Sequence, residues 1–236
     1  EYVVVHEREA CPIPAGLTFE EAAAIPEAFV TAHDALVTRA GLTAGERCLV
    51  HAVGSGVGTA ALQLAKAAGA TVFGTSRTAA KLERAAALGL DVGIDTRRED
   101  FADVVERRTD GRGVHVVLDL VGAPYLAGNL RALAPRGRMV VVGLPGGGRG
   151  EIDLGVVLGK RLTIVGTALR TRPLEEKIAA VQRFREQVLP LLEAGRLRPV
   201  VDAAWPLEDA AEAHRRMEQN LNFGKIVLRV AGPERA

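Results

Sequence analysis

The sequence feature that most constrains the fold is an apolar run that leads directly into a glycine-rich turn and then into a helical pattern. Residues 48–53 form the apolar run, which is too short for a helix and predicts a strand buried on both faces. The turn at 54–58 reads Gly-Ser-Gly-Val-Gly, and apolar residues then recur at helical spacing until Gly69 ends the helix. This order predicts a dinucleotide-binding unit, in which the backbone approaches a pyrophosphate and the helix N-terminus faces that anion.

The glycine turn alone does not decide between binding and a purely structural role. The glycine positions of the pattern G-x-G-x-x-G would fall on Val53, Ser55 and Gly58, so the strict pattern is not met. A tight strand-to-helix turn that binds nothing therefore stays open as an alternative. A phosphate-binding P-loop is excluded, because the sequence contains no G-x-x-x-x-G-K-[ST] string. A nucleophile elbow is also excluded, because it needs glycine two residues to either side of the serine, and Ser55 has Val53 and Val57 there.

Composition places the chain among ordinary globular proteins. Its 236 residues carry a formal net charge of +1, which gives no electrostatic reason to expect a nucleic-acid or membrane partner. No apolar run approaches the roughly 18 residues of a membrane span. The two cysteines, Cys11 and Cys48, cannot form a disulfide framework and predict a cytoplasmic setting. Residues 1–5 already resemble the middle of a strand, with no initiator Met or targeting segment, so we expect the back part of a longer protein.

The remaining pattern alternates short strands with helices. We expect six strands, with helices at 79–89, 99–109 and 125–133 and strands at 48–53, 71–75, 92–94, 114–120, 139–142 and 162–165. Parallel neighbours require crossovers, so this α/β pattern predicts a doubly wound, six-stranded parallel sheet of the Rossmann type. Ligands would bind where the first and fourth strands end, and the glycine-rich segment 143–150 predicts a flexible loop at the same crevice.

The two ends of the chain do not follow this alternation. Thr18 and Glu21 predict a capping box for a short helix that Pro26 interrupts before a second helix at 27–40. Toward the C-terminus we expect one long helix bent at Pro190, an extended segment, another helix and a last strand, at 173–194, 199–205, 207–220 and 225–230. We therefore predict a nucleotide-binding domain at 41–168 and a second lobe formed by 1–40 and 169–236.

The end of the second predicted strand indicates which dinucleotide is preferred. Sheets that bind NAD usually place Asp or Glu there, whereas this sequence continues as Ser76 and Arg77, and its first acidic residue is Glu83. A hydroxyl and cations bind a 2′-phosphate, so Ser76, Arg77 and Lys81 favour NADPH. The alternative is that Arg77 and Lys81 are solvated charges at the start of a helix.

Four segments together carry a family resemblance. They are IPEAFVTAHDAL at 25–36, HAVGSGVGTAALQLAKAAGA at 51–70, VLDLVG around Leu118 and GKIVL at 224–228. These segments resemble the zinc-free, zeta-crystallin-like quinone oxidoreductases of the medium-chain dehydrogenase/reductase superfamily, and the likeness extends to about residue 230. The resemblance implies remnants of a chaperonin-10-like substrate lobe that is mostly absent from this chain. It also implies NADPH, a homodimer, and two-electron reduction of quinones or other activated C=C–C=O compounds.

The same resemblance implies a set of cofactor-binding residues. Thr31 would lie near the nicotinamide, Ser55, Gly56 and Val57 near the pyrophosphate, and Ser76, Arg77 and Lys81 near the 2′-phosphate. Weaker matches at the phosphate end are Asn222 and Lys225. The cleft would be lined by Val121, Gly122, Gly143, Leu144, Thr167, Ala168 and Leu169.

One position departs from the family pattern. Relatives often place a tyrosine in the loop after the third strand to contact the adenosine, and this sequence has Thr96 there. We expect that contact to be lost or replaced.

Metal ligands and catalytic side chains are not evident in the sequence. Zinc-dependent relatives have a cysteine at the position of Glu27, and neither CxxC nor HxxxH occurs. His51 and His115 fall in predicted inner strands, which favours core or cleft-lining roles over metal binding. We predict no zinc and assign no catalytic residue.

Two other functions remain open from the sequence. An enoyl reductase of the polyketide or fatty-acyl type would share the fold and the cofactor, and a nucleotide-binding module without turnover would share the glycine turn. The acceptor itself is not identified by the sequence. The edge strand at 162–165 is expected to pair with a second copy, because unpaired strand edges invite a partner.

Overall fold

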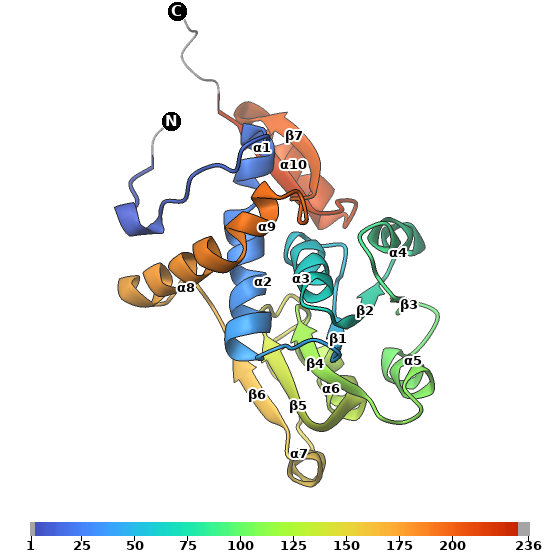
Figure 1. The fold of residues 1–236 in the computed structure, drawn as a ribbon. Coiled ribbons are helices and arrows are strands. Elements are labelled where there is room, and N and C mark those ends of the chain that lie inside the picture. Colours follow the sequence, from blue (N-terminus) through green and yellow to red (C-terminus); the bar gives the residue numbers. More distant parts are fainter. Residues whose placement is uncertain (1–2, 231–236) are drawn as a thin grey trace, which may run out of the picture.

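The computed structural model describes residues 3–230, which form a parallel sheet flanked by helices and a small second sheet beside it (Figure 1). The main sheet has six strands in the order β3-β2-β1-β4-β5-β6, and every neighbouring pair is parallel. These strands are β3 (Val92–Asp95), β2 (Thr71–Ser76), β1 (Arg47–Val50), β4 (Val114–Asp119), β5 (Leu133–Val141) and β6 (Thr163–Gly166). This is the Rossmann order, and the predicted doubly wound α/β fold is confirmed.

Helices cover both faces of the sheet. Side chains that alternate along each strand therefore enter two separate cores, one on each face. In β1, Cys48 and Val50 join the core beneath α3 (Gly56–Ala67), whereas Leu49 joins the core beneath α5 (Phe101–Arg108) and α6 (Leu126–Ala132). All three β1 residues are fully buried. Strands buried on both faces read as continuous apolar runs, which is the pattern seen in the sequence. The helices α4 (Ala79–Ala86) and α7 (Leu154–Lys160) complete the crossovers.

The N-terminal part leads into a helical run beside α3. A short 3₁₀ turn, η1 (Glu7–Glu9), precedes α1 (Phe19–Ala23), and the predicted capping box is present in both directions: Glu21 N–H donates to Thr18 Oγ1 (3.2 Å) and Thr18 N–H to Glu21 Oε2 (2.9 Å). Pro26 then starts a run with π-type turns at both ends, made of η2 (Pro26–Val30), α2 (Thr31–His33) and η3 (Asp34–Arg39). Phe29 and Leu36 of this run are buried in the core beneath α3.

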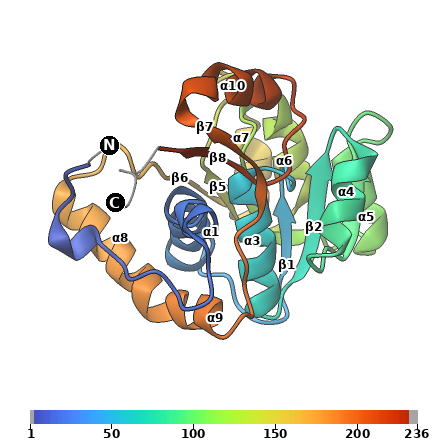
Figure 2. The same cartoon turned by 90° about the horizontal axis from the view of Figure 1, so that it is seen from above.

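The C-terminal part differs from the prediction at one point. The expected long helix is two helices, α8 (Leu174–Gln187) and α9 (Leu189–Glu193), separated at Val188, where φ is −111°. Pro190 explains the break, because a proline within the first turn of a helix is tolerated but cannot continue a preceding one. Figure 2 shows α8 on one side of α3 and the strands, with α4 and α5 on the other.

A second sheet follows α9. It contains β7 (Val201–Pro206) and β8 (Lys225–Arg229), which pair in parallel and are connected by η5 (Leu207–Asp209) and α10 (Ala210–Glu218). Helix α1 packs against both strands, so segments from the two ends of the chain lie together there (Figure 1). Their assignment to one substrate lobe stays a prediction. Among residues 3–230, no helix combines the length and apolarity needed to span a bilayer.

Several predicted boundaries are wrong by a few residues. Strand β1 ends at Val50 rather than at 53, because Ala52 has a left-handed backbone (φ 46°) that turns the chain early. Strand β5 begins at Leu133, where the sequence indicated a helix end, and its pairing with β4 is irregular between Val114 and Val116.

Candidate nucleotide-binding site

The glycine turn after β1 forms the centre of the candidate site. Ser55 is the N-cap of α3, and its Oγ accepts the Gly58 N–H at 3.0 Å. A Cβ on Gly58 would overlap the Ala52 carbonyl oxygen, so only glycine allows the helix to start this close to the strand. Within residues 3–230, the N–H groups of Gly56 and Val57 have no acceptor. They present the positive end of a twelve-residue helix to an anion.

A C-terminal segment lies directly against this turn. Gly224 N–H donates to the Gly54 carbonyl at 2.9 Å, and Ser55 and Gly224 form an isolated parallel bridge. A Cβ on Gly56 would overlap the Lys225 side chain, so the stem of Lys225 packs on the start of α3. The assignment of Lys225 to the phosphate end of the cofactor stays a prediction. The Asn222 side chain instead braces its own segment, with Nδ2 donating to the Gly224 carbonyl at 3.1 Å.

The end of β2 gathers the residues predicted for the 2′-phosphate. Ser76 is buried, and its Oγ accepts the Thr78 N–H at 3.1 Å. Lys81 is 8% exposed, and its Nζ donates to Asn220 Oδ1 at 2.9 Å. Burial lowers the pKa of the Lys81 ammonium, Asp202 opposes this, and nearby arginines that include Arg77 add to the lowering. Of the three predicted residues only Arg77 is exposed, while Ser76 and Lys81 are already engaged.

A carboxylate that the sequence analysis did not weigh lies beside this cluster. Strand register places Asp95 of β3 opposite Ser76, and Asp95 Oδ1 accepts the Arg97 N–H at 3.0 Å. Asp95 is the last residue of the next strand along the chain, so its position beside Ser76 could be found only from the order of strands in the sheet. The Asp95 carboxylate places a negative charge where a 2′-phosphate would bind.

The loops after β4 and β5 form one hydrogen-bonded unit. Gly146 N–H donates to the Val121 carbonyl and Ala123 N–H to the Gly147 carbonyl, both at 2.9 Å. Gly122 has φ 97°, and a Cβ there would lie 2.6 Å from the Gly147 oxygen, so glycine is required. The structure thus brings predicted cleft residues together, since Leu144 also contacts Gly122 and Gly143 N–H points to the Asp119 carbonyl (3.4 Å).

A buried ion pair holds the end of β6 against the N-terminal helical run. Thr167 Oγ1 donates to Asp34 Oδ2 at 2.7 Å, and Arg172 pairs with the same carboxylate at 2.5 Å. Burial opposes ionisation of Asp34, but Arg172 and Thr167 outweigh it, and the pKa of Asp34 is held below its ordinary value. Thr31, three residues earlier in the same run, is partly exposed. Of the other predicted residues here, Ala168 is exposed and Leu169 half-buried.

Thr96 is contacted by an aromatic residue from another loop. Its N–H and Oγ1 donate to the Ser76 carbonyl at 3.0 and 3.4 Å, and the Tyr125 hydroxyl donates to Thr96 Oγ1 at 3.2 Å. The Tyr125 ring packs against His51 and Phe101, with centroid distances of 4.7 and 5.0 Å. Sequence reasoning missed Tyr125, because a residue that follows a different strand gives no local signal of this contact.

The two histidines predicted for inner strands differ. His51 is fully buried immediately after β1, whereas His115 in β4 is partly exposed and its Nδ1 accepts the Arg47 N–H at 2.9 Å. Across the described part of the chain, no three His, Cys, Asp or Glu side chains lie close enough together to hold a metal ion. The described residues therefore do not fit a zinc site.

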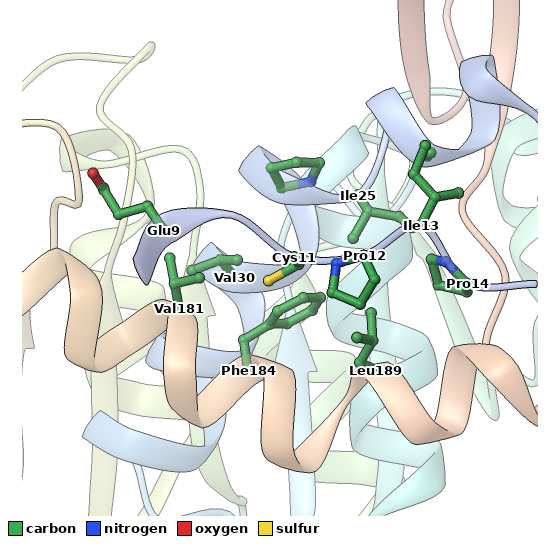
Figure 3. A pocket seen from close by; sticks show the side chains of 12 residues that line it. Glu9, Cys11, Pro12, Ile13, Pro14, Ile25, Val30, Val181, Phe184 and Leu189 are labelled. Atoms are coloured by element: carbon green, nitrogen blue, oxygen red, sulfur yellow. The ribbon is translucent and has the colours of Figure 1, made fainter. Parts of the chain in front are cut away.

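A separate hollow lies between the N-terminal segment and α8 and α9. Figure 3 shows Cys11, Val30 and Phe184 gathered around it, and the lining is apolar apart from Glu9. Burial raises the pKa of the Cys11 thiol, which leaves it protonated and a poor nucleophile. The hollow contains no acid–base pair and is lined by none of the predicted cofactor-binding residues.

Comparison with known proteins identifies related sequences. Residues 56–192 match the family model described as zinc-binding dehydrogenase. The chain is 38% identical over 95% of its length to the spectinabilin polyketide synthase system protein NorB of Streptomyces orinoci. It is 31% identical over its full length to the synaptic vesicle membrane protein VAT-1 homolog of Rattus norvegicus, and 30% identical over 97% to the quinone oxidoreductase of Homo sapiens. It spans 10%, 61% and 68% of those three proteins.

Solved structures show the same fold. An NAD-dependent alcohol dehydrogenase superposes with a TM-score of 0.87 at 40% identity, covering 97% of this chain and 64% of the other. The CurK enoyl reductase gives 0.79 at 31%, covering 94% and 65%. Mycobacterial Rv1454c complexed with NADPH gives 0.83 at 28%, covering 92% and 67%.

Proposed function

Because the chain belongs to the zinc-binding dehydrogenase family of the medium-chain dehydrogenase/reductase superfamily, whose members are NAD(P)-dependent oxidoreductases, we propose that it transfers a hydride from NADPH to quinones or other activated C=C–C=O acceptors without zinc. The chain spans only part of the relatives it matches, so this activity is proposed for the protein to which the chain contributes its nucleotide-binding part.

The observation that carries the proposal is the anion-binding cradle at the start of α3. Gly56 and Val57 direct N–H groups at the position of a pyrophosphate, and the packing of Gly58 on Ala52 leaves room only for backbone. Arg77 and Lys81 add positive charge at the end of β2, which suits a 2′-phosphate. These features support NADPH as the cofactor.

The chain's own residues would act by binding and orientation. When bound, the nicotinamide supplies the hydride. The joined loops after β4 and β5 and the helical run around Thr31 would fix the ring against the acceptor, because hydride transfer depends on the distance and alignment of the two reacting carbons. We assign no proton donor.

A second candidate is an enoyl reductase of the polyketide or fatty-acyl type. It is favoured by the likeness to NorB, a polyketide synthase system protein, and to the CurK enoyl reductase. Both enzymes would share the nucleotide site and differ in the acceptor, a small quinone in one case and an enoyl thioester in the other. A nucleotide-binding module without turnover remains the third candidate.

The deciding experiment has two stages. Fluorescence titration of the chain with NADPH and with NADH measures cofactor preference, and a lower Kd for NADPH supports the charge argument at β2. Oxidation of NADPH by a small ortho-quinone is then compared with oxidation by a crotonyl thioester, using the full-length protein that contains this chain. Quinone turnover supports the proposal, thioester turnover alone favours the enoyl reductase, and tight binding with neither turnover favours the binding module.

We also propose that a second copy of the chain pairs with β6. Among residues 3–230 this strand pairs only with β5, and exposed apolar side chains occur on it and on the preceding helix α7: Ile164 (37% exposed) on β6, and Leu154 (68%) and Leu158 (80%) on α7. Analytical ultracentrifugation is expected to show dimers that Leu158→Glu dissociates. Monomeric wild-type chain would contradict this proposal.

A further inference from the structure

A hydrogen-bonded network of buried side chains connects the loop after β1 to the loop after β4, and these two loops border the proposed nucleotide crevice. His51, the residue after β1, has its Nδ1 2.9 Å from Thr75 Oγ1 and its Nε2 2.6 Å from Asn129 Oδ1. Asn129 lies in α6, and its Nδ2 donates to Asp119 Oδ2 at 3.1 Å. His51 and Asn129 are both 0% exposed, and Thr75 and Asp119 are nearly so. None of these four residues was predicted to contact the cofactor.

The direction of every hydrogen bond in this network is determined by the chemical groups at which the network ends. The Asp119 carboxylate can only accept, so Asn129 turns its amide nitrogen toward Asp119 and its oxygen toward His51. His51 Nε2 must therefore carry the proton. Burial lowers the pKa of His51, so the ring is neutral and Nδ1 accepts the Thr75 hydroxyl proton. Thr75 Oγ1 in turn accepts the Ala52 N–H at 3.3 Å.

Each end of this hydrogen-bonded network fixes a backbone segment that contains a residue with positive φ. At one end Ala52 has φ 46° and leads into the glycine turn. At the other end Asp119 Oδ1 accepts the N–H groups of Val121 (2.8 Å) and Gly122 (2.9 Å), where φ of Gly122 is 97°. The loop after β5 is bonded to this second loop, so its position depends on Asp119 as well.

The hydrogen-bonded network lies among apolar groups. The His51 ring packs edge-on against Phe101 and Tyr125, with centroid distances of 4.8 and 4.7 Å. In this position a leucine would fill a similar volume without any polar atom to satisfy. The four side chains instead satisfy one another, and no buried side-chain nitrogen or oxygen in the described structure lacks a partner. A complete network of this kind fixes one geometry, because each lost bond leaves a buried group unpaired.

We infer that His51 and Asn129 are positioning residues, which couple the glycine turn after β1 to the loop after β4 and so set both sides of the dinucleotide crevice. The inference rests on the proposed nucleotide-binding function. Neither residue would touch the cofactor. Each would act through the backbone of Ala52, Val121 and Gly122.

The first test does not depend on nucleotide binding. Long-range ¹H–¹⁵N NMR of the histidine side chains in the 236-residue chain is expected to show His51 as the neutral Nε2–H tautomer at pH 7. The backbone amides of Ala52, Val121 and Gly122 are then compared between wild type and Asn129→Leu. Shifts at all three positions support coupling. An Nδ1–H or doubly protonated ring, or an unchanged Ala52 amide, would overturn the inference.

The second test measures NADPH affinity well below the melting temperature. Asn129→Leu is expected to weaken binding about tenfold, because unpaired buried groups let both loops relax. Ile94→Ala is the control: it is fully buried in the core on the same face of the sheet and outside the chain of hydrogen bonds. His51→Gln, whose amide can donate to Asn129, should recover most of the affinity that His51→Leu loses.

The outcomes separate the two proposals. Equal NADPH Kd values for Asn129→Leu and Ile94→Ala would mean that Asn129 only fills the core, and the inference fails. Wild-type chain that does not bind NADPH would contradict the proposed cofactor, and the NMR comparison would then decide alone whether the two loops are coupled.

Discussion

The two sides of the proposed nucleotide crevice, at the end of β2 and at the ends of β4, β5 and β6, differ in what positions their binding groups. On the β2 side, the groups proposed for the cofactor are long charged side chains, such as Arg77 and Lys81, and Lys81 donates to Asn220 of the C-terminal segment. On the side of β4, β5 and β6, backbone geometry is fixed by buried carboxylates: Asp119 holds two N–H groups, and Asp34 holds Thr167 and Arg172. The first side can adjust affinity through charge, whereas the second sets shape. Substitutions on the first side should therefore change binding directly, whereas those on the second should change stability, and binding only through the shape of the loops.

The largest effect is expected at Asp34. Asp34→Asn leaves the Arg172 guanidinium, which is 8% exposed, without a counter-charge, and should lower the free energy of unfolding by about 3–5 kcal/mol in urea titrations. The control is Glu20→Gln, which breaks the solvent-exposed pair with Arg229 and should cost far less. Equal losses in the two variants would contradict the distinction between buried and exposed pairs.

The Asp34 effect should also depend on pH. The pKa of this carboxyl is lower in the folded than in the unfolded chain, so its contribution is complete above the unfolded value of about 3.9 and is lost as the pH falls through the folded pKa. The difference in unfolding free energy between wild type and Asp34→Asn should therefore shrink below about pH 4. A difference independent of pH would point to a different cause.

A second stability effect is expected at Gly122. Gly122→Ala places a Cβ 2.6 Å from the Gly147 oxygen at a backbone φ of 97°, and should lower the free energy of unfolding by about 2 kcal/mol. Gly143→Ala, in the next loop of the same crevice, meets nothing closer than 3.7 Å and serves as the control. Thermal unfolding of both variants measures the difference, and a stable Gly122→Ala protein would show that the loop adapts.

On the β2 side, Lys81→Met should change affinity more than stability. Loss of the ammonium removes a charge-assisted contact to a 2′-phosphate, so the Kd for NADPH should rise about tenfold while the Kd for NADH stays nearly constant. Lys66→Met is the matched control, because Lys66 pairs with Asp91 on the surface and was not predicted to contact the cofactor. Parallel losses for both nucleotides would assign Lys81 to folding instead.

The smallest effect is expected from Asp95→Asn. Removing the carboxylate opposite Ser76 should tighten NADPH binding about threefold through reduced repulsion, with little change for NADH. Asp110→Asn, 86% exposed at its side chain on a different loop, should leave both Kd values unchanged. Weaker NADPH binding in Asp95→Asn would mean that this carboxylate orders the loop rather than repels the phosphate.

The sequence predicted the layout of the fold better than the contacts of the site. Strand burial and helix ends are local patterns. The apolar run around Cys48 and the helix N-cap at Thr18 could therefore be predicted directly from the sequence. The break at Val188 was missed because the sequence shows Pro190 but not where the helix gives way. The pairs His51–Asn129 and Asp34–Thr167 join residues 78 and 133 positions apart, and periodicity indicates a buried face without telling which side chains meet there.

The bond from Gly224 to Gly54 has a consequence for how the protein is made. These residues lie far apart in the sequence, so the glycine turn lacks one of its partners until the segment around Gly224 has been synthesised. The Rossmann sheet can assemble earlier, because all its strands end by Gly166. Nucleotide that binds only the completed turn would thus discriminate chains that extend past Gly224 from shorter ones.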